Sequence, residues 1–182
     1  MELLLLGILV GVGTGLVRYR SIGGLATHTL KGERVVVLVM VIQGAVPVLG
    51  RFMGIGDGAI TALWVLMTTS LLLLAIANSD RCWMLLAACG LVLNIVVVSA
   101  NGGMPVDLSR IVDSRVTTAR ARLDESPIHV EADEKTNLAF LGDRIPVPLG
   151  RTRRGLVSIG DCVLAIGAML VAYDMMKVAE HP

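Results

Sequence analysis

Five long stretches of this sequence contain few or no charged side chains, and this feature constrains the fold more than any other. A helix needs about 17–25 mostly apolar residues to cross a bilayer, and an unpaired backbone is too costly in hydrocarbon for any isolated strand to do so. The stretches are residues 3–17, 35–49, 59–77, 83–100 and 158–178. We therefore predict an all-α integral membrane protein with about five transmembrane helices and an ordered polar loop before the last helix.

Composition supports this prediction and excludes two other classes of protein. Hydrophobic residues make up 54% of the chain, charged residues 17% and aromatic residues 3%, whereas soluble domains carry about 25% charged residues. The formal net charge of +1 gives no electrostatic reason to expect a nucleic-acid partner. No cofactor or metal is expected, because the sequence has no CxxC or HExxH pattern and its three histidines are scattered.

The polar residues divide the chain into three predicted parts. Residues 1–100 form a four-helix transmembrane region, residues 101–157 an extramembrane loop, and residues 158–182 the final transmembrane helix and a short tail. Of the 31 formally charged side chains, 17 fall between residues 101 and 155. Loops of this length are functional or disordered in most proteins, and the glycine and proline signals in this one favour order.

Within the loop, the spacing of apolar residues predicts three local structures. Residues 107–123 form an amphipathic helix, which lies either on the membrane surface or against the rest of the loop. Residues 126–140 alternate around a polar turn, which favours a small hairpin. Residues 141–148 are punctuated by glycine and proline and are expected to be extended.

The position of the basic residues predicts how the protein sits in the cell membrane. The first apolar stretch follows Met1 and Glu2 and precedes Arg18 and Arg20, the opposite of a cleaved signal peptide. By the positive-inside bias, these arginines face the cytoplasm. The N-terminus and the long loop are then expected to be extracytoplasmic in a multi-pass protein.

Several polar residues and glycines in the apolar stretches are expected to have structural roles. Ser158 and Asp161 fit a capping box at the start of the last helix. Asn94 and Gln43 are expected to form interhelical hydrogen bonds. Gly7, Gly11 and Gly15 recur every four residues and predict a close-packed helix face.

Three carboxyl groups are candidates for catalysis: Asp107, Asp143 and Asp161. The fourth and fifth helices both meet the loop at one side of the membrane, so these acids can gather at that edge. Two neighbouring carboxyl groups titrate apart, and the pair can supply an acid and a base for hydrolysis. The predicted binding residues are the turn that leaves the fourth helix and a histidine in the loop that can carry a proton: Asn101, Gly102, Gly103, Met104, Pro105 and His129.

The segments NGGMPV (101–106), DEKT (133–136), LGDRIP (141–146) and SIGD (158–161) resemble a family of small uncharacterised bacterial multi-pass membrane proteins. That resemblance implies a multi-pass membrane architecture and a prokaryotic source. Residues 161–167 are locally similar to the last span of lipoprotein signal peptidases, membrane aspartic proteases, and Asp161 would then be a catalytic acid. In this chain VSIG (157–160) replaces the Phe-Asn-x-Ala of that family, and its Gly-Asn-x-x-Asp-Arg motif is missing, so Asp107 or Asp143 would have to be the second acid.

These observations leave three hypotheses for function. The first is a binding or scaffold module whose extracytoplasmic loop contacts a protein partner, a lipid or a small ligand. The second is an aspartate-dependent membrane hydrolase that uses Asp161 with Asp143 or Asp107. The third is a component of a small-solute transporter, which needs paired polar sites at the bilayer midplane, where Gln43 and Asn94 are the candidates. The expected partners are the lipid bilayer and a protein partner or a second copy of the chain.

Overall fold

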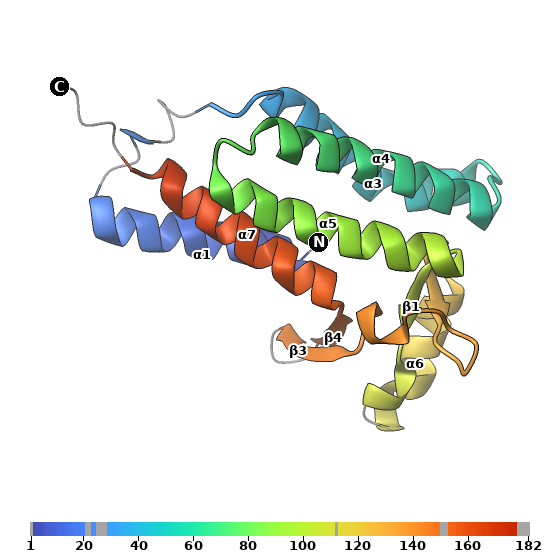
Figure 1. The fold of residues 1–182 in the computed structure, drawn as a ribbon. Helices are drawn as coiled ribbons and strands as arrows, with labels where there is room; N and C mark the ends of the chain where they lie inside the picture. The colour runs from blue at the N-terminus through green and yellow to red at the C-terminus, as the bar shows by residue number, and fades with distance from the viewer. Residues whose placement is uncertain (1, 21–22, 25–28, 112, 150–152, 178–182) are drawn as a thin grey trace.

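The computed structural model describes residues 2–20, 23–24, 29–111, 113–149 and 153–177, and these residues form a helical bundle with a small folded cap (Figure 1). The helices are α1 (Glu2–Tyr19), α3 (Glu33–Phe52), α4 (Asp57–Ala77), α5 (Cys82–Asn101), α6 (Asp113–Asp124) and α7 (Ile159–Met175). The strands are β1 (Met104–Val106), β2 (His129–Glu131), β3 (Ile145–Leu149) and β4 (Arg153–Val157). Two short 3-10 helices are η1 (Leu108–Arg110) and η2 (Ala139–Leu141).

Three of the helices are long and apolar enough to cross a membrane by length and composition. These are α3, α4 and α5, and a shorter apolar helix covers Leu3–Tyr19 within α1. Helix α7 has 17 residues. The predicted helical membrane architecture is therefore supported at the level of three to four apolar helices.

Helices α1, α5 and α7 pack closely because small residues line their contacts. A Cβ at Gly7 would lie 2.5 Å from the carbonyl oxygen of Ala165 in α7, and a Cβ at Gly167 would lie 2.5 Å from the backbone nitrogen of Ala87 in α5. Gly11 also meets the α7 backbone, and Gly15 meets Met176 just beyond α7, which confirms the predicted glycine face. Helices α3 and α4 form a hairpin that lies beside α5 (Figure 1).

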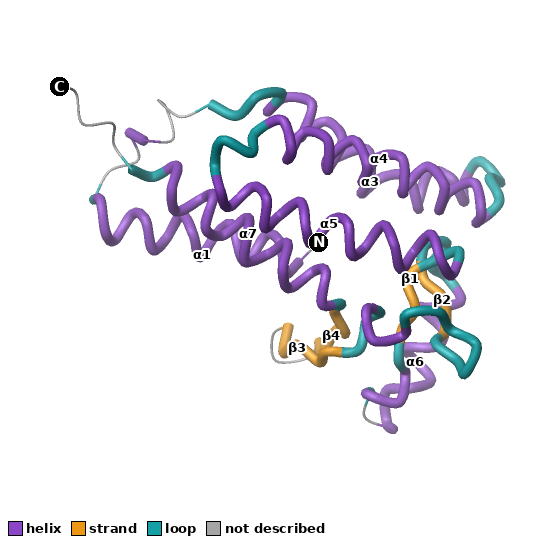
Figure 2. Tube along the Cα trace, in the orientation of Figure 1, coloured by secondary structure: helices purple, strands orange, loops and turns teal. Residues whose placement is uncertain are grey.

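The cap consists of the described residues between 102 and 158 and joins the end of α5 to the start of α7, as the orange strands and teal loops of Figure 2 show. Strands β1 and β2 pair in parallel, with Met104 opposite His129. Strands β3 and β4 form an antiparallel ribbon. The hairpin predicted for residues 126–140 was therefore wrong. Strand β2 pairs with β1 across a long connection, because the backbone that leaves α5 offers it an open edge.

The helix predicted for residues 107–123 begins later than expected. Residue Asp107 caps η1 through its side chain, which accepts from the backbone nitrogen of Ser109, and α6 begins at Asp113. Val116, Ala119 and Leu123 are half-buried on one face, as the spacing predicted. Helix α6 packs on β2 and η1 within the cap. Val112, part of the predicted apolar face, lies outside the described residues.

Candidate functional site

A cavity of about 460 Å³ lies where the cap meets the helices. Most of its wall is aliphatic, but six polar side chains also face it, from four helices and the cap. They are Gln43 in α3, Thr68 in α4, Asn94 in α5, Asp161 in α7, and His129 and Asp143 in the cap. The lining thus includes two carboxyl groups and a histidine in a largely apolar setting.

Asp161 is held at the edge of this cavity by its own helix and by α5. Ser158 Oγ accepts from the Asp161 backbone nitrogen at 2.9 Å, so the predicted capping box is present. Asn94 Nδ2 donates to Asp161 Oδ1 at 2.7 Å, and Ser158 Oγ donates to Asn94 Oδ1 at 3.0 Å. Asn94 and Ser158 are both buried. The predicted interhelical role of Asn94 is confirmed, and its partner is the carboxylate itself.

Asp143 is held by the backbone of the cap. Its nitrogen donates to the Pro105 carbonyl at 2.7 Å, and its own carbonyl accepts from the Asp107 nitrogen at 2.9 Å. These bonds tie residue 143 to the β1 segment and direct its side chain inward, where the residue is only 8% exposed.

The carboxyl group of Asp143 is chemically unusual. Among the described residues its Oδ1 atom is buried without a hydrogen-bond partner. Burial, and then the charge of Asp161, raise the pKa of Asp143 to about 8. Asp143 therefore keeps its proton at neutral pH and can donate as well as accept a hydrogen bond.

His129 stands next to Asp143, with its Nε2 atom 3.9 Å from Asp143 Oδ2. Its Nδ1 atom shares a hydrogen bond with Ser126 Oγ, 2.6 Å away. Burial lowers the pKa of His129, although the charge of Asp161 acts in the opposite direction. Both His129 and Asp143 are then neutral at pH 7, so their proximity is not an ion pair. At 3.9 Å, His129 Nε2 and Asp143 Oδ2 are too far apart for a direct hydrogen bond, and both residues line the cavity.

Gln43 and Thr68 close the opposite wall. Gln43 Nε2 donates to Thr68 Oγ1 at 2.8 Å, and Thr68 Oγ1 donates to the Trp64 carbonyl at 2.8 Å. The predicted interhelical bond of Gln43 is thus confirmed. The Thr68 hydroxyl thus both accepts and donates, and the Gln43–Thr68 bond joins α3 to α4 at this wall.

The other predicted site residues lie elsewhere, except Met104, which also lines the cavity. Asp107 accepts from Ser109 and Arg110, and the hydroxyl of Ser109 lowers the pKa of Asp107. Asn101 ties α5 to the cap, because its Oδ1 accepts from the Asn137 nitrogen at 2.8 Å.

The glycines and the proline of this turn are structural. Gly102 has a φ of 71° and ends α5, and a Cβ at Gly103 would crowd Val130. Pro105 is fully buried in β1. Of the three acids predicted to gather, the structure brings Asp143 and Asp161 to one cavity and leaves Asp107 outside it.

Two lining side chains with hydrogen-bonding groups, Thr68 and Trp64, were not singled out from the sequence. Each sits in an apolar stretch where its spacing is not distinctive. A polar side chain opposite Gln43 was the one available signal for Thr68. Across the described residues, no group of three or more His, Cys, Asp or Glu side chains is placed to hold a metal ion.

Comparison with known proteins gives a family. A model described as a family of unknown function, DUF5317, matches residues 27–173, which include α3, α4, α5, the whole cap and nearly all of α7. No curated protein matched the chain, and no solved structure matched it. Because the match covers most of the sequence and every polar residue of the cavity, the chain belongs to this family of unknown function.

Proposed function

We propose that the protein is a membrane-embedded binding module that holds a small amphipathic ligand in the cavity between the cap and the helices. The supporting observation is that Asp143 and Asp161 face a largely aliphatic cavity in which Asp143 Oδ1 is buried without a partner. A buried polar atom without a partner costs about 1–3 kcal/mol. A ligand that donates a hydrogen bond there recovers that cost.

The charges around the cavity favour one class of polar head. Two carboxyl groups line it, and none of its described lining residues is Lys or Arg. Lowering of the His129 pKa by burial keeps that ring neutral. An anionic head would meet Asp161 without a compensating cation, whereas an ammonium or hydroxyl head donates to both carboxyl groups. The ligand class is therefore a cationic or neutral hydrogen-bond donor with an apolar body.

Tryptophan fluorescence tests this proposal, because Trp64 lines the cavity and Trp83 does not. In a Trp83→Phe background in detergent, dodecylamine and dodecanol are expected to change the Trp64 emission saturably. Dodecanoate, with the same chain, is expected to need at least a tenfold higher concentration. Equal responses to all three amphiphiles would contradict the proposal.

Matched substitutions test whether the polar head of the ligand lies at Asp143 and Asp161. Asp161→Asn is expected to weaken dodecylamine binding about 10- to 100-fold, the effect of losing one hydrogen bond to a charged group. Asp143→Asn keeps the shape of the side chain but removes the acid. The control is Asp133→Asn, which changes an exposed cap carboxyl whose partners are Lys135 and Thr136. Parent-like dodecylamine binding by both cavity variants would overturn the assignment of the head.

A second candidate function is an aspartate-dependent membrane hydrolase, and one observation favours it: Asp143 and Asp161 line the same cavity, and the charge of Asp161 contributes to the raised pKa of Asp143. A protonated acid beside a second carboxyl group is the arrangement that paired-acid hydrolysis uses. The test is cleavage of an internally quenched peptide that carries an acylated cysteine. Cleavage lost in both Asp143→Asn and Asp161→Asn supports hydrolysis, and amine binding without cleavage supports the binding module.

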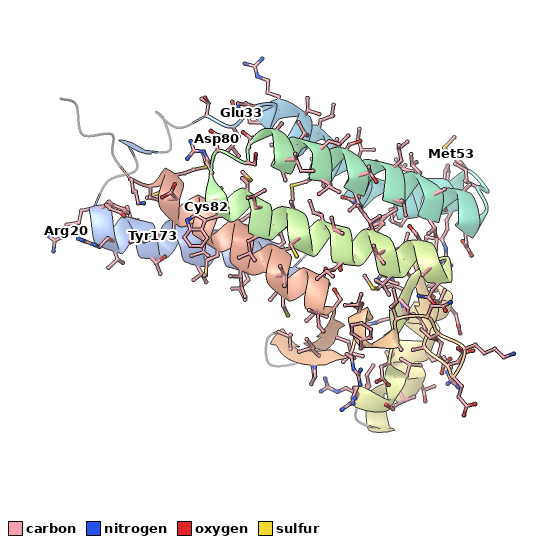
Figure 3. The ribbon with its side chains drawn as sticks, viewed as in Figure 1. Arg20, Glu33, Met53, Asp80, Cys82 and Tyr173 are labelled. Carbon is pink, nitrogen blue, oxygen red and sulfur yellow. The ribbon has the colours of Figure 1, made fainter. Side chains whose placement is uncertain are left out.

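We also propose that all five long helices span the membrane and that the cap faces outward. Arg20 and Glu33 lie at the end of the bundle opposite the cap, together with Asp80, Cys82 and Tyr173 (Figure 3). The basic residues next to this end favour a cytoplasmic position. In a chain with its three cysteines changed to serine, Glu134→Cys is expected to react with an impermeant thiol reagent from outside. Glu33→Cys should react only after the cells are opened, and the reverse pattern would overturn the orientation.

A further inference from the structure

A second cavity, of about 330 Å³, continues from the first toward the opposite end of the bundle. Five residues line both cavities, and each comes from a different helix: Leu4 of α1, Met40 of α3, Leu71 of α4, Leu91 of α5 and Leu164 of α7. The two cavities are therefore one groove that runs between the α1–α5–α7 group and the α3–α4 hairpin.

The two parts of this groove differ in chemistry. The six polar side chains named above line the part under the cap, whereas Asn78 at the far end is the only polar side chain among the described lining residues of the second part. Asn78 is already bonded to the Lys31 backbone, with its Oδ1 accepting at 2.7 Å and its Nδ2 donating at 3.0 Å. The far part thus offers hydrocarbon contacts and no free polar group on Asn78.

The length of the groove fits an extended chain. Along α4 it reaches from Trp64 to Asn78, which is about 21 Å of helix at 1.5 Å per residue. One leaflet of a bilayer has a hydrocarbon depth of about 15 Å. A single alkyl chain of leaflet length therefore fits along the groove, and the surrounding bilayer is the source of such chains.

We propose that this groove holds the alkyl chain of a single-chain amphiphile taken from the bilayer, with its hydrogen-bond-donating head at Asp143 and Asp161 and its chain end near Leu74 and Met175. This inference rests on the proposed function, because the head site is the one described there. It adds that the apolar body is a single alkyl chain from the bilayer, and it adds the path of that chain. The chain lies between the α1–α5–α7 group and the α3–α4 hairpin.

Photolabelling tests where each end of the ligand lies. Two dodecylamine probes are used with the full chain in nanodiscs, one with a diazirine next to the amine and one with a diazirine at the chain end. The first is expected to label cavity residues under the cap, such as Met104 and Ile128. The second is expected to label Leu74, Met84 or Met175. Unlabelled dodecylamine in tenfold excess should reduce both labels by at least fivefold.

A blocking variant sharpens the test. Ala168 lines the far part of the groove and is half-buried, so Ala168→Phe should fill that part. Labelling by the chain-end probe at Leu74 and Met175 is expected to fall at least fivefold, while labelling near the amine stays within twofold. Ala62→Phe is the control, because Ala62 is exposed on α4 and lines neither part.

The possible failures separate the two proposals. If the amine-end probe labels the cavity but the chain-end probe labels outward residues such as Leu66 or Leu73, the tail path is overturned and the head site stands. If the amine-end probe does not label the cavity at all, both proposals are overturned. Unchanged chain-end labelling in Ala168→Phe, in a protein that still folds, also contradicts the tail path.

Discussion

Both ends of the bundle contain polar side chains, but they differ in whether their acids lie next to basic residues. At the end without the cap, two acids have basic neighbours: Lys31 lies 3.6 Å from Asp80, and Arg81 lies 3.8 Å from Asp174, which also bonds Lys177. Under the cap, Asp143 and Asp161 share one cavity whose described lining has no Lys or Arg, and Asp143 Oδ1 has no partner.

This difference distinguishes polar groups that stabilise the structure from polar groups that are available to a ligand. Paired, exposed charges hold loops together and cost little in water. Two carboxyl groups that face an aliphatic cavity raise the free energy of the folded protein, and one of them must keep its proton. The cost under the cap is the physical reason to place function there, and the opposite end serves as the internal comparison.

The largest expected effect comes from disrupting the close contact between α5 and α7 next to the cap. A Cβ at Gly160 would overlap Asn94 Oδ1 and approach the Gly90 carbonyl at 2.9 Å. Gly160→Val is expected to cost about 3 kcal/mol or more, the upper end of overpacking, with loss of folded protein by size-exclusion chromatography. Gly13→Ala is the control, because a Cβ there meets nothing within 4 Å. A well-folded Gly160→Val protein would show that α5 and α7 are not packed as described.

The next effect comes from removing the amide that holds Asp161. Asn94→Leu leaves Asp161 Oδ1 without its donor and Ser158 Oγ without its acceptor. We expect a loss of about 1.5–3 kcal/mol, as for a hydrogen bond to a charged group, measured by thermal unfolding in detergent. If Asn94→Leu is as stable as the parent, the Asn94–Asp161 bond contributes nothing and the carboxylate is held otherwise.

The pH dependence of stability distinguishes the buried acid from an ordinary one. The pKa of Asp143 is about 8 when folded, so between its ordinary value and pH 8 the unfolded chain gives up a proton that the folded chain keeps. Stability should therefore fall as pH rises through this window and level off above pH 8. The loss is expected to be at least about 1.4 kcal/mol, the equivalent of a shift of one pKa unit.

Asp143→Asn should remove this part of the pH dependence, with His129 and Asp161 unchanged. Asp107 gives the opposite sign, because the lowered pKa of Asp107 makes its contribution disappear as pH falls. Unfolding midpoints from about pH 2 to 9 measure both effects, because the Asp107 contribution is lost only below its ordinary pKa of 3.8. An identical pH profile for the parent and Asp143→Asn would contradict the raised pKa.

The smallest effect is expected at the opposite end. The Lys31 and Asp80 side chains are 68% and 65% exposed, and exposed pairs contribute about 0–1 kcal/mol. Asp80→Asn should change stability by less than about 0.5 kcal/mol and should leave amphiphile binding unaltered. A large loss of binding on this substitution would mean that the two ends are coupled.

The sequence predicted the parts of this fold that are local or strongly periodic. Uncharged apolar runs predicted the long helices, the spacing of Ser158 and Asp161 predicted a capping box, and Gly7, Gly11 and Gly15 predicted a packing face. Each of these depends on residues a few positions apart, so the pattern is visible without tertiary structure. The number of spans was harder, because α7 is short and carries Asp161 and Asp174.

Long-range contacts could not be predicted in the same way. The pairing of β1 with β2 joins Met104 to His129, and a three-residue strand has too little pattern to specify a distant partner. The burial of Asp143 depends on its backbone bonds to β1, which the sequence does not reveal. Topology predicted that acids gather where the cap meets the bundle, and it did not separate Asp107 from Asp143.

The most direct test of the account is the infrared absorption of the protonated Asp143 carboxyl group. At pH 6.5 we expect a carboxylic-acid band that is absent in Asp143→Asn, disappears with a midpoint near pH 8, and shifts when octylamine is added. A band that disappears at the pH of an ordinary aspartate, or one that octylamine leaves unchanged, would contradict the claim that this buried acid is available to a ligand.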